Sequence, residues 1–171
     1  MREALGAEKR ESLSVAIAEQ FFNQFDSVKH MSIFLPIERL NEINTWHIIK
    51  GSNACHYLPV VQNDVLKHIK YENRDQLEIS DWGIPEPTYG TEVKPEVFEI
   101  VLIPLLAVDK EGNRVGYGKG FYDSFLGQCS PQCKFVGLSY FDPLEQIDDS
   151  WEGDIQLHAL ISPKGLIEFK Q

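Results

Sequence analysis

The sequence predicts an α/β fold built on a mainly parallel sheet. Residues 97–108 (VFEIVLIPLLAV) are the most apolar run, too short for a membrane span, and they predict a central strand buried on both faces. Strand-like and helical segments alternate along the chain, which is typical of parallel sheets connected by helices. We expect the 171 residues to form a single domain, residues 1–171.

The first predicted element is a helix over residues 3–26. Ser12 or Ser14 could cap a second helical segment within it, so one helix and two helices both fit the pattern. The apolar residues of the segment recur at helical spacing and form one stripe that is expected to pack on the core: Ala18, Phe21, Phe22 and Phe25.

The elements that follow are short. A strand is predicted over residues 31–37, where Pro36 stops it, and a short helix ends at Gly51. Residues 80–90 (SDWGIPEPTYG) contain three closely placed helix and strand breakers and predict a turn-rich segment. Trp82 in this segment fits two interpretations, a pocket wall and a plug over the core. Apolar runs predict further strands at 54–61, 65–71, 134–141, 155–162 and 165–169.

Charge and composition exclude several classes of function. Asp and Glu total 26 against 16 Lys and Arg, a net charge of −10, whereas nucleic-acid binding depends on basic residues that neutralise phosphates. No apolar run approaches the roughly 20 residues of a membrane span. We therefore expect no nucleic-acid partner, no membrane partner and a cytoplasmic location. The odd number of cysteines and their spacing predict reduced thiols at Cys55, Cys129 and Cys133.

A glycine-rich loop follows the central strand and carries the strongest functional signal. Gly116, Gly118 and Gly120 have no Cβ atoms, so a ligand can approach the backbone N–H groups closely. Arg114 and Lys119 bracket the loop with positive charge, and a predicted helix begins at its end. The combination predicts a phosphate site, and a mobile surface turn is the alternative.

Acidic residues near this loop predict a metal ion. Asp123 lies one turn into the predicted helix, where a carboxylate would repel bound phosphates unless a cation such as Mg²⁺ lies between them. Asp154, or another acid of the segment 142–154, could be a second ligand. Most of that acidic segment is expected to be a solvated loop.

The stretch IVLIPLLAVDKEGNRVGYGKGFYDSFL closely resembles the signature of the 5-formyltetrahydrofolate cyclo-ligase family, roughly P-x-L-A-F-D-x-x-G-x-R-L-G-x-G-x-G-Y-Y-D. Val108, Val115 and Phe121 are mild substitutions within this pattern. Three other segments resemble the family in the same order along the chain: SIFLPIERLNEINT, WGIPEP and GDIQLHALISPKG. The resemblance therefore covers nearly the whole chain.

This resemblance implies a three-layer α/β/α fold of the type found in sugar-phosphate isomerases and CoA-transferases. It also implies ATP and Mg²⁺ as cofactors and 5-formyltetrahydrofolate as the substrate, which is converted to 5,10-methenyltetrahydrofolate with release of ADP and phosphate. In the family mechanism the γ-phosphate is transferred to the formyl oxygen, N10 attacks the activated carbon, and phosphate departs. We expect the protein to be a monomer.

The resemblance also implies roles for individual residues. Glu42 would hydrogen-bond the pterin ring, and Trp82 would form a flat apolar wall for the folate. The catalytic residues would be Arg114, Lys119 and Tyr122. The nucleotide would contact Arg114, Gly116, Tyr117, Gly118, Lys119, Gly120, Phe121 and Tyr122. The folate would contact Leu35, Glu42, Trp82, Tyr117 and Phe121. Mg²⁺ would be bound by Asp123 and Asp154.

Two departures from the family pattern leave alternatives open. The family begins with Lys-x-x-Leu-Arg, whose cations meet the nucleotide phosphates, whereas this chain has only Arg2, Lys9 and Arg10 near its start. His158 stands where the family usually has Asp. One alternative is a catalytically weak folate- or nucleotide-binding homologue that lacks the N-terminal cation. Another, resting on fold analogy only, is a sugar-phosphate isomerase-type enzyme.

Overall fold

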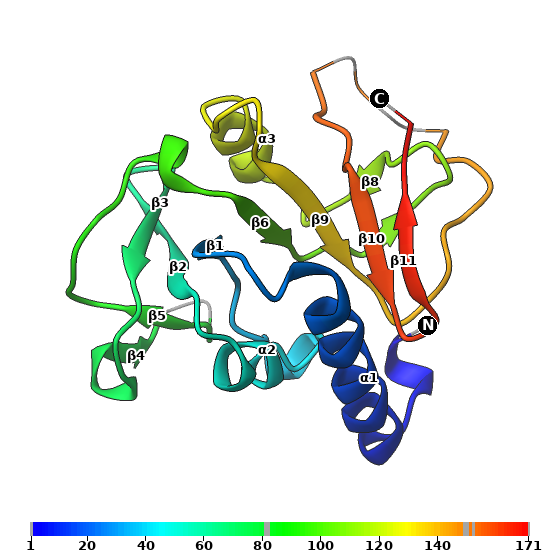
Figure 1. Cartoon of the computed structure of the whole chain (residues 1–171), viewed down its shortest axis with the longest axis horizontal. Helices are drawn as coiled ribbons and strands as arrows, with labels where there is room; N and C mark the ends of the chain where they lie inside the picture. Colours follow the sequence, from blue (N-terminus) through cyan, green and yellow to red (C-terminus); the bar gives the residue numbers. More distant parts are fainter. Residues whose placement is uncertain (1, 81–82, 149–150, 152, 171) are drawn as a thin grey trace.

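The computed structural model describes residues 2–80, 83–148, 151 and 153–170, and within them seven strands form one sheet (Figure 1). Their order is β11-β10-β9-β6-β1-β2-β3. The five inner strands pair in parallel, and β3 and β11 add antiparallel at the two edges, so the predicted mainly parallel sheet is confirmed. The strands are β1 (His30–Ser32), β2 (Cys55–Gln62), β3 (Val65–Lys70), β6 (Ile100–Ile103), β9 (Lys134–Leu138), β10 (Ala159–Ser162) and β11 (Gly165–Glu168).

Helices cover both faces of this sheet. On one face, α1 and α2 pack on a core that contains Ile100 and Leu102 of β6. On the other face, α3 packs on a second core that contains Val101 and Ile103 of the same strand. Alternate residues of one strand thus enter opposite cores, which confirms the three-layer arrangement and the doubly buried central strand. The helices are α1 (Ala7–Phe25), α2 (Trp46–Gly51) and α3 (Phe121–Leu126).

Of the two arrangements left open for the N-terminal segment, a single continuous helix is the one that forms. Ile17 and Phe21 of α1 are buried against the sheet, and Ser14 lies inside the helix instead of capping a second one. The residues before α1 were predicted to be helical from residue 3 and form a 3-10 turn over Arg2–Ala4. The extended backbone of Gly6, with ψ of 156°, separates this turn from α1.

Two predicted strands are shorter in the structure than in the prediction. Residues 31–37 pair with neighbours only as far as the end of β1 and then continue as irregular chain. Within residues 97–108, Pro104 has no N–H with which to continue the ladder, so β6 stops before it. Ala107–Val108 (β7) pair instead with Arg114–Val115 (β8) in a separate hairpin.

The remaining elements lie where the sequence predicts them, with ends that differ by up to four residues. The turn-rich segment 80–90 also contains a strand, β5 (Pro85–Pro87), which pairs with β4 (Leu77–Ile79). Trp82 lies outside the described residues. The three cysteines are free thiols, as predicted, and no described helix is long and apolar enough to cross a membrane. The connections hold 3-10 helices at Glu38–Leu40 (η2), Arg74–Gln76 (η3) and Pro95–Val97 (η4).

A buried histidine lies in the second core. His68 of β3 is 1% exposed, and its ring centroid lies 5.0 Å from that of Phe98 and 4.2 Å from that of Phe125. Its Nε2 lies 2.8 Å from Ser32 Oγ, whereas Nδ1 has no hydrogen-bond partner among the described residues. Burial lowers the pKa of His68 to about 3, so the ring is neutral at physiological pH.

We expect His68 to make the fold sensitive to acid. The unfolded chain binds a proton at this ring near pH 6.5 and the folded chain does not, so stability is full above pH 6.5 and is lost as pH falls toward 3. His68→Gln should reduce the slope of the unfolding free energy in this window by up to about 1.4 kcal/mol per pH unit. Urea unfolding at several pH values measures the slope, and equal slopes for the two proteins would contradict the prediction.

Candidate functional site

A cavity of about 1100 Å³ opens where two central strands end. Its walls include Phe34 and Leu35, which follow β1, and Pro104, which follows β6. Within the sheet, β2 lies next to β1 on one side, and β6 lies next to β1 on the other side. Open α/β sheets bind ligands at such a switch point, beyond the carboxyl ends of the strands.

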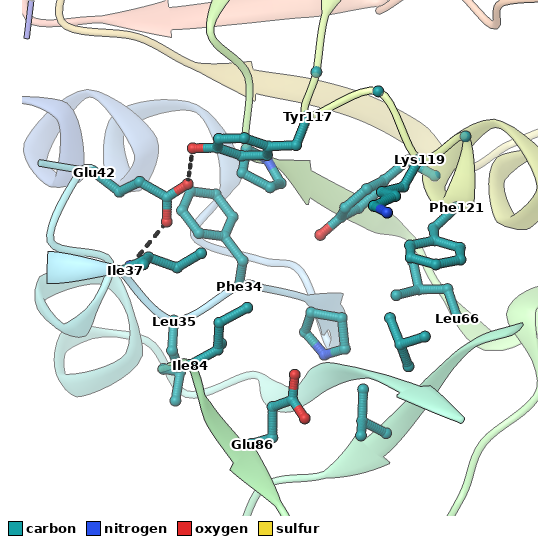
Figure 2. Close-up of a pocket in the computed structure, with 18 of the residues that line it drawn as sticks. Phe34, Leu35, Ile37, Glu42, Leu66, Ile84, Glu86, Tyr117, Lys119 and Phe121 are labelled. Carbon is teal, nitrogen blue, oxygen red and sulfur yellow. Dashed lines mark hydrogen bonds between the residues drawn. The ribbon is translucent and has the colours of Figure 1, made fainter. Parts of the chain in front are cut away.

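Most of the residues predicted from the sequence line this one cavity. In Figure 2, Glu42 and Tyr117 lie close together, and Lys119 and Phe121 lie together at another part of the wall. Trp82 lies outside the described residues. The predicted residues that line the cavity are Leu35, Glu42, Arg114, Gly116, Tyr117, Gly118, Lys119, Gly120, Phe121, Tyr122, Asp123 and Asp154.

The glycines of the loop face open space. A Cβ atom built on Gly116, Gly118 or Gly120 would meet no heavy atom within 4 Å. Gly118 and Gly120 also have positive φ angles of 76° and 66°, which side chains disfavour. The described protein atoms therefore leave the backbone of this loop accessible to a ligand in the cavity, as a phosphate cradle requires.

Arg114 and Asp123 form an ion pair inside the site. Arg114 Nη2 lies 2.6 Å from Asp123 Oδ1, and the side chains are 6% and 27% exposed. Arg114 Nη1 donates to the carbonyl of Ile155, whose own N–H donates to Asp123 Oδ1 at 3.1 Å. The pair therefore ties the first turn of α3 to the chain that follows Asp154. Both residues were predicted to lie in the site, but their pairing was not predicted.

The two predicted metal ligands lie on the same cavity. Asp154 is exposed, and its Oδ2 accepts the N–H of Trp151 at 3.2 Å. The bonds to Asp123 described above all end on Oδ1. Among the described residues, no group of three or more His, Cys, Asp or Glu is arranged to hold a metal. A set of two carboxylates suits Mg²⁺, which usually takes one or two carboxylates together with phosphate oxygens and water.

Glu42 is a buried carboxylate at another part of the cavity. It is 7% exposed, its Oε2 accepts the N–H of Ile37 at 2.9 Å, and its Oε1 accepts the hydroxyl of Tyr117 (Figure 2). Burial raises the pKa of Glu42, and the two hydrogen bonds and Arg2 oppose that shift. Burial and the neighbouring carboxylate also raise the pKa of Tyr117 to about 12, so this hydroxyl remains a hydrogen-bond donor.

Arg2, near the start of the chain, lies beside the Tyr117 hydroxyl. Its Nη1 lies 3.4 Å from Tyr117 Oη, and its Nη2 donates to the carbonyl of Leu105. Arg10 instead donates to the carbonyl of Leu5, away from the loop. Of the basic residues near the start of the chain, Arg2 therefore brings positive charge to the glycine-rich loop.

One wall of the cavity was not predicted from the sequence. Val60 and Leu66 line it from the β2–β3 hairpin, and Glu86 lines it from β5. Burial raises the pKa of Glu86. Strand periodicity gives no signal that a hairpin at the sheet edge reaches a central cavity, because that depends on the strand order. The resemblance of WGIPEP to the family was the one available signal for Glu86.

His158 acts away from this cavity. Its Nδ1 accepts the N–H of Phe135 at 2.9 Å, and the two rings lie 4.8 Å apart. This bond links β9 to the residue just before β10, and a carboxylate at position 158 could accept the same N–H. His158 is not among the described residues that line the cavity.

We expect Glu42→Gln to stabilise the fold by about 0.5–1 kcal/mol at pH 7. Because the pKa of Glu42 is raised in the folded state, the ionised form costs stability at neutral pH, and this cost disappears as pH falls through the titration. The advantage of the variant in urea unfolding should therefore shrink at pH 4. The control is Glu78→Gln, which makes the same substitution at an exposed residue of β4. A variant less stable than the wild type at pH 7 would contradict the prediction.

Comparisons with known proteins agree on one family. The sequence matches the model of the 5-formyltetrahydrofolate cyclo-ligase family over residues 1–140. It is 32% identical to a 5-formyltetrahydrofolate cyclo-ligase of Mus musculus over 142 residues, which are 74% of this chain and 68% of the mouse protein. It is 36% identical to the enzyme of the same name from Mycoplasma genitalium over 141 residues, 79% of this chain and 73% of that protein.

Solved structures agree with the sequence relatives. The NMR structure of Aquifex aeolicus 5,10-methenyltetrahydrofolate synthetase superposes with a TM-score of 0.85 at 27% identity, covering 99% of this chain and 88% of that one. A 5,10-methenyltetrahydrofolate synthetase from Mycoplasma pneumoniae superposes with a TM-score of 0.71 at 24% identity, covering 95% and 92%, and supports the fold. The residues matched by the family model include the glycine-rich loop and the segment of Glu42. This chain belongs to the 5-formyltetrahydrofolate cyclo-ligase family.

Proposed function

We propose that this protein converts 5-formyltetrahydrofolate to 5,10-methenyltetrahydrofolate and consumes ATP in the presence of Mg²⁺. One observation carries the proposal. A single cavity at the switch point of the sheet joins an open glycine-rich loop, two carboxylates and a separate buried carboxylate. Its volume, about 1100 Å³, lies at the upper end of small-molecule sites and suits two reactants side by side.

The loop end of the cavity suits a magnesium nucleotide. The open backbone of Gly116 to Gly120 would bind phosphate oxygens, and Lys119 would supply the neutralising charge. Asp123 and Asp154 would hold Mg²⁺ together with those phosphates. Arg114 already donates to Asp123, so we propose that it orients this carboxylate in addition to the predicted phosphate contact.

The other end suits the folate. Leu35 and Phe121 offer apolar contacts, and Glu42 offers a carboxylate that would accept hydrogen bonds from the N–H groups of the pterin ring. Burial raises the pKa of the Tyr122 hydroxyl above its ordinary value, so this group keeps its proton and would act as a donor. Tyr117 belongs to the loop and bonds Glu42, and it would lie between the two reactants.

The chemistry needs positioning and charge neutralisation more than covalent help from the protein. When bound, MgATP supplies the phosphoryl group that turns the formyl oxygen into a leaving group before N10 closes the ring. Lys119 and the loop N–H groups would neutralise charge on the phosphates. Glu42 and the apolar wall would hold the folate with its formyl oxygen toward the loop, and the cavity would limit access of water.

A direct assay tests this proposal. Purified protein is mixed with 5-formyltetrahydrofolate, ATP and Mg²⁺, and the absorbance of the methenyl product is followed. We expect product only when ATP and Mg²⁺ are both present. Product without ATP, or no product at any ATP concentration, overturns the proposal. Binding of both reactants without turnover would favour the alternative of a catalytically weak homologue.

A further inference from the structure

Glu42 lies on a short irregular segment that no helix or strand holds in place. The segment runs between η2 and α2 and has no regular secondary structure. It begins at Asn41, whose φ of 51° is in the left-handed region, and it ends at Thr45, whose hydroxyl donates to the carbonyl of Phe34 at 2.6 Å. Backbone groups between these points must find partners elsewhere in the fold, because buried polar groups are costly when unpaired.

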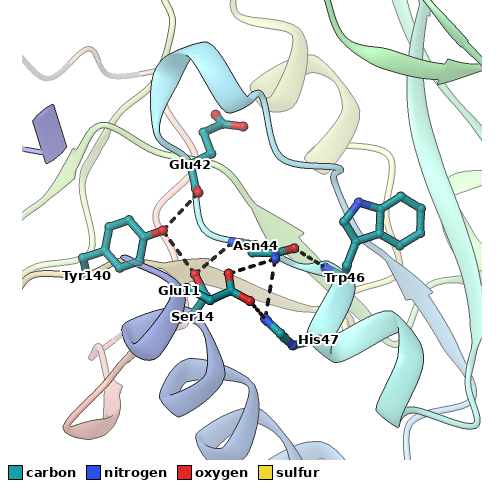
Figure 3. A network of polar contacts seen from close by, with 7 residues as sticks. All are labelled: Glu11, Ser14, Glu42, Asn44, Trp46, His47 and Tyr140. Atoms are coloured by element: carbon teal, nitrogen blue, oxygen red, sulfur yellow. Dashed lines mark hydrogen bonds and ion pairs between the residues drawn. The ribbon is translucent and has the colours of Figure 1, made fainter. Parts of the chain in front are cut away.

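Two buried hydroxyls from other elements supply these partners (Figure 3). Tyr140, just after β9, donates its hydroxyl to the carbonyl of Glu42 at 3.0 Å. Ser14 Oγ, in α1, lies 3.1 Å from Tyr140 Oη and accepts the N–H of Asn44 at 3.0 Å. Ser14 is 1% and Tyr140 is 7% exposed.

The donors and acceptors of this network have one consistent direction. The Tyr140 proton goes to the Glu42 carbonyl, so Tyr140 Oη must accept the proton of Ser14. Ser14 Oγ in turn accepts the N–H of Asn44. The chain of bonds therefore leaves the segment at the Asn44 N–H and returns to it at the Glu42 carbonyl, and it fixes the two peptide groups that directly follow the Cα of Glu42.

The carboxylate itself depends on this backbone. Oε2 accepts the N–H of Ile37, and Oε1 accepts the hydroxyl of Tyr117, so both oxygens already have fixed partners from other segments. A shift of the Glu42 backbone would misalign both bonds and the face that the carboxylate presents to the cavity. Misplacement of a binding group by about 1 Å is enough to weaken recognition strongly.

We propose that Ser14 and Tyr140 are positioning residues for the folate, which act by holding Glu42 in the orientation that binds the pterin ring. This inference rests on the proposed function. Neither residue is among those that line the cavity, so their effect on the folate must pass through Glu42. Nucleotide binding at the glycine-rich loop should not depend on them.

The test separates folate binding from nucleotide binding. Calorimetry measures the Kd of 5-formyltetrahydrofolate and, separately, that of a non-hydrolysable ATP analogue with Mg²⁺. Tyr140→Phe keeps the ring and removes one hydrogen bond. It should raise the folate Kd about five- to tenfold, the ratio that corresponds to the free energy of one hydrogen bond. The nucleotide Kd should stay within about twofold of the wild-type value. Ser14→Ala should raise the folate Kd in the same way and serves if Tyr140→Phe does not fold.

Tyr57→Phe is the matched control. Tyr57 is 6% exposed, and its hydroxyl lies 3.1 Å from His30 Nδ1 in β1, so this variant also removes one hydrogen bond of a buried tyrosine. It should leave the folate Kd within about twofold, since this bond makes no contact with the segment of Glu42. A folate Kd raised equally by Tyr57→Phe and Tyr140→Phe overturns the inference.

A double variant distinguishes positioning from a general loss of structure. In a Glu42→Gln background, Tyr140→Phe should change the folate Kd by less than about twofold, because the carboxylate through which it acts is gone. A further change as large as that in the wild-type background overturns the inference. Wild-type protein that binds no 5-formyltetrahydrofolate overturns the proposed function and this inference together. Wild-type binding with an unchanged Kd in Tyr140→Phe and Ser14→Ala overturns the inference alone.

Discussion

Lys119→Met is expected to reduce turnover about 10²- to 10³-fold and to leave the fold intact. Lys119 is exposed on the glycine-rich loop and lines the cavity, so its removal creates no void in either core. Its charge would act on phosphates that gain negative charge at their oxygens during transfer. The measurement is kcat with saturating folate together with the KM for ATP.

Lys110→Met is the matched control for this variant. Lys110 is also exposed and lies in the turn before the loop, where its Nζ contacts Glu145 at 2.6 Å. This variant removes the same charge from the same region and should keep wild-type kcat and KM, because Lys110 is not among the described residues that line the cavity. Equal effects of the two substitutions, or unchanged turnover in Lys119→Met, would mean that the nucleotide binds elsewhere.

Asp123→Ala is expected to abolish measurable turnover and also to destabilise the fold by about 2–3 kcal/mol. The second effect arises because Arg114, at 6% exposure, would keep its charge without its partner. Asp123→Asn retains an oxygen that can accept from Arg114 and Ile155, so it should lose much less stability and still lose activity. Urea unfolding and the methenyl assay, run on both variants, separate the two effects.

The control for the two Asp123 variants is Asp142→Asn. Asp142 pairs with Lys164 at 2.5 Å on the surface, and the pair is well exposed, so the change should have little effect on stability or turnover. If Asp123→Asn retained wild-type turnover at every Mg²⁺ concentration, the carboxylate would have no role in metal binding. Its position in the family signature would then reflect the ion pair with Arg114 alone.

Local patterns predicted the parts of the molecule that depend on local chemistry. The apolar run around Ile100 gave the central strand, and the glycines at 116, 118 and 120 gave an accessible loop at its end. Pro104 shortened the strand, as its missing N–H requires, although the apolar pattern continued through it. Patterns within short stretches of sequence do not predict the order of the strands or the contacts between distant segments.

Most parts of the site that were missed depend on such distant contacts. Arg2 meets Tyr117 across 115 residues of sequence, and Tyr140 meets Glu42 across 98. The pairing of Arg114 with Asp123 spans only nine residues, but it was missed because Arg114 was assigned to phosphate and Asp123 to Mg²⁺. Glu86 reaches the cavity only because β5 folds against the β2–β3 hairpin.

The hydrogen bond between Tyr117 and Glu42 links the glycine-rich loop to the buried carboxylate at the other end of the cavity. Tyr117 belongs to the loop, so any movement of the loop around a nucleotide alters the hydrogen bonding of the carboxylate. Where one reactant changes the affinity of the protein for the other, thermodynamic reciprocity makes the two changes equal. Any coupling between the two reactants would pass through the Tyr117 hydroxyl, which joins the loop to the buried carboxylate.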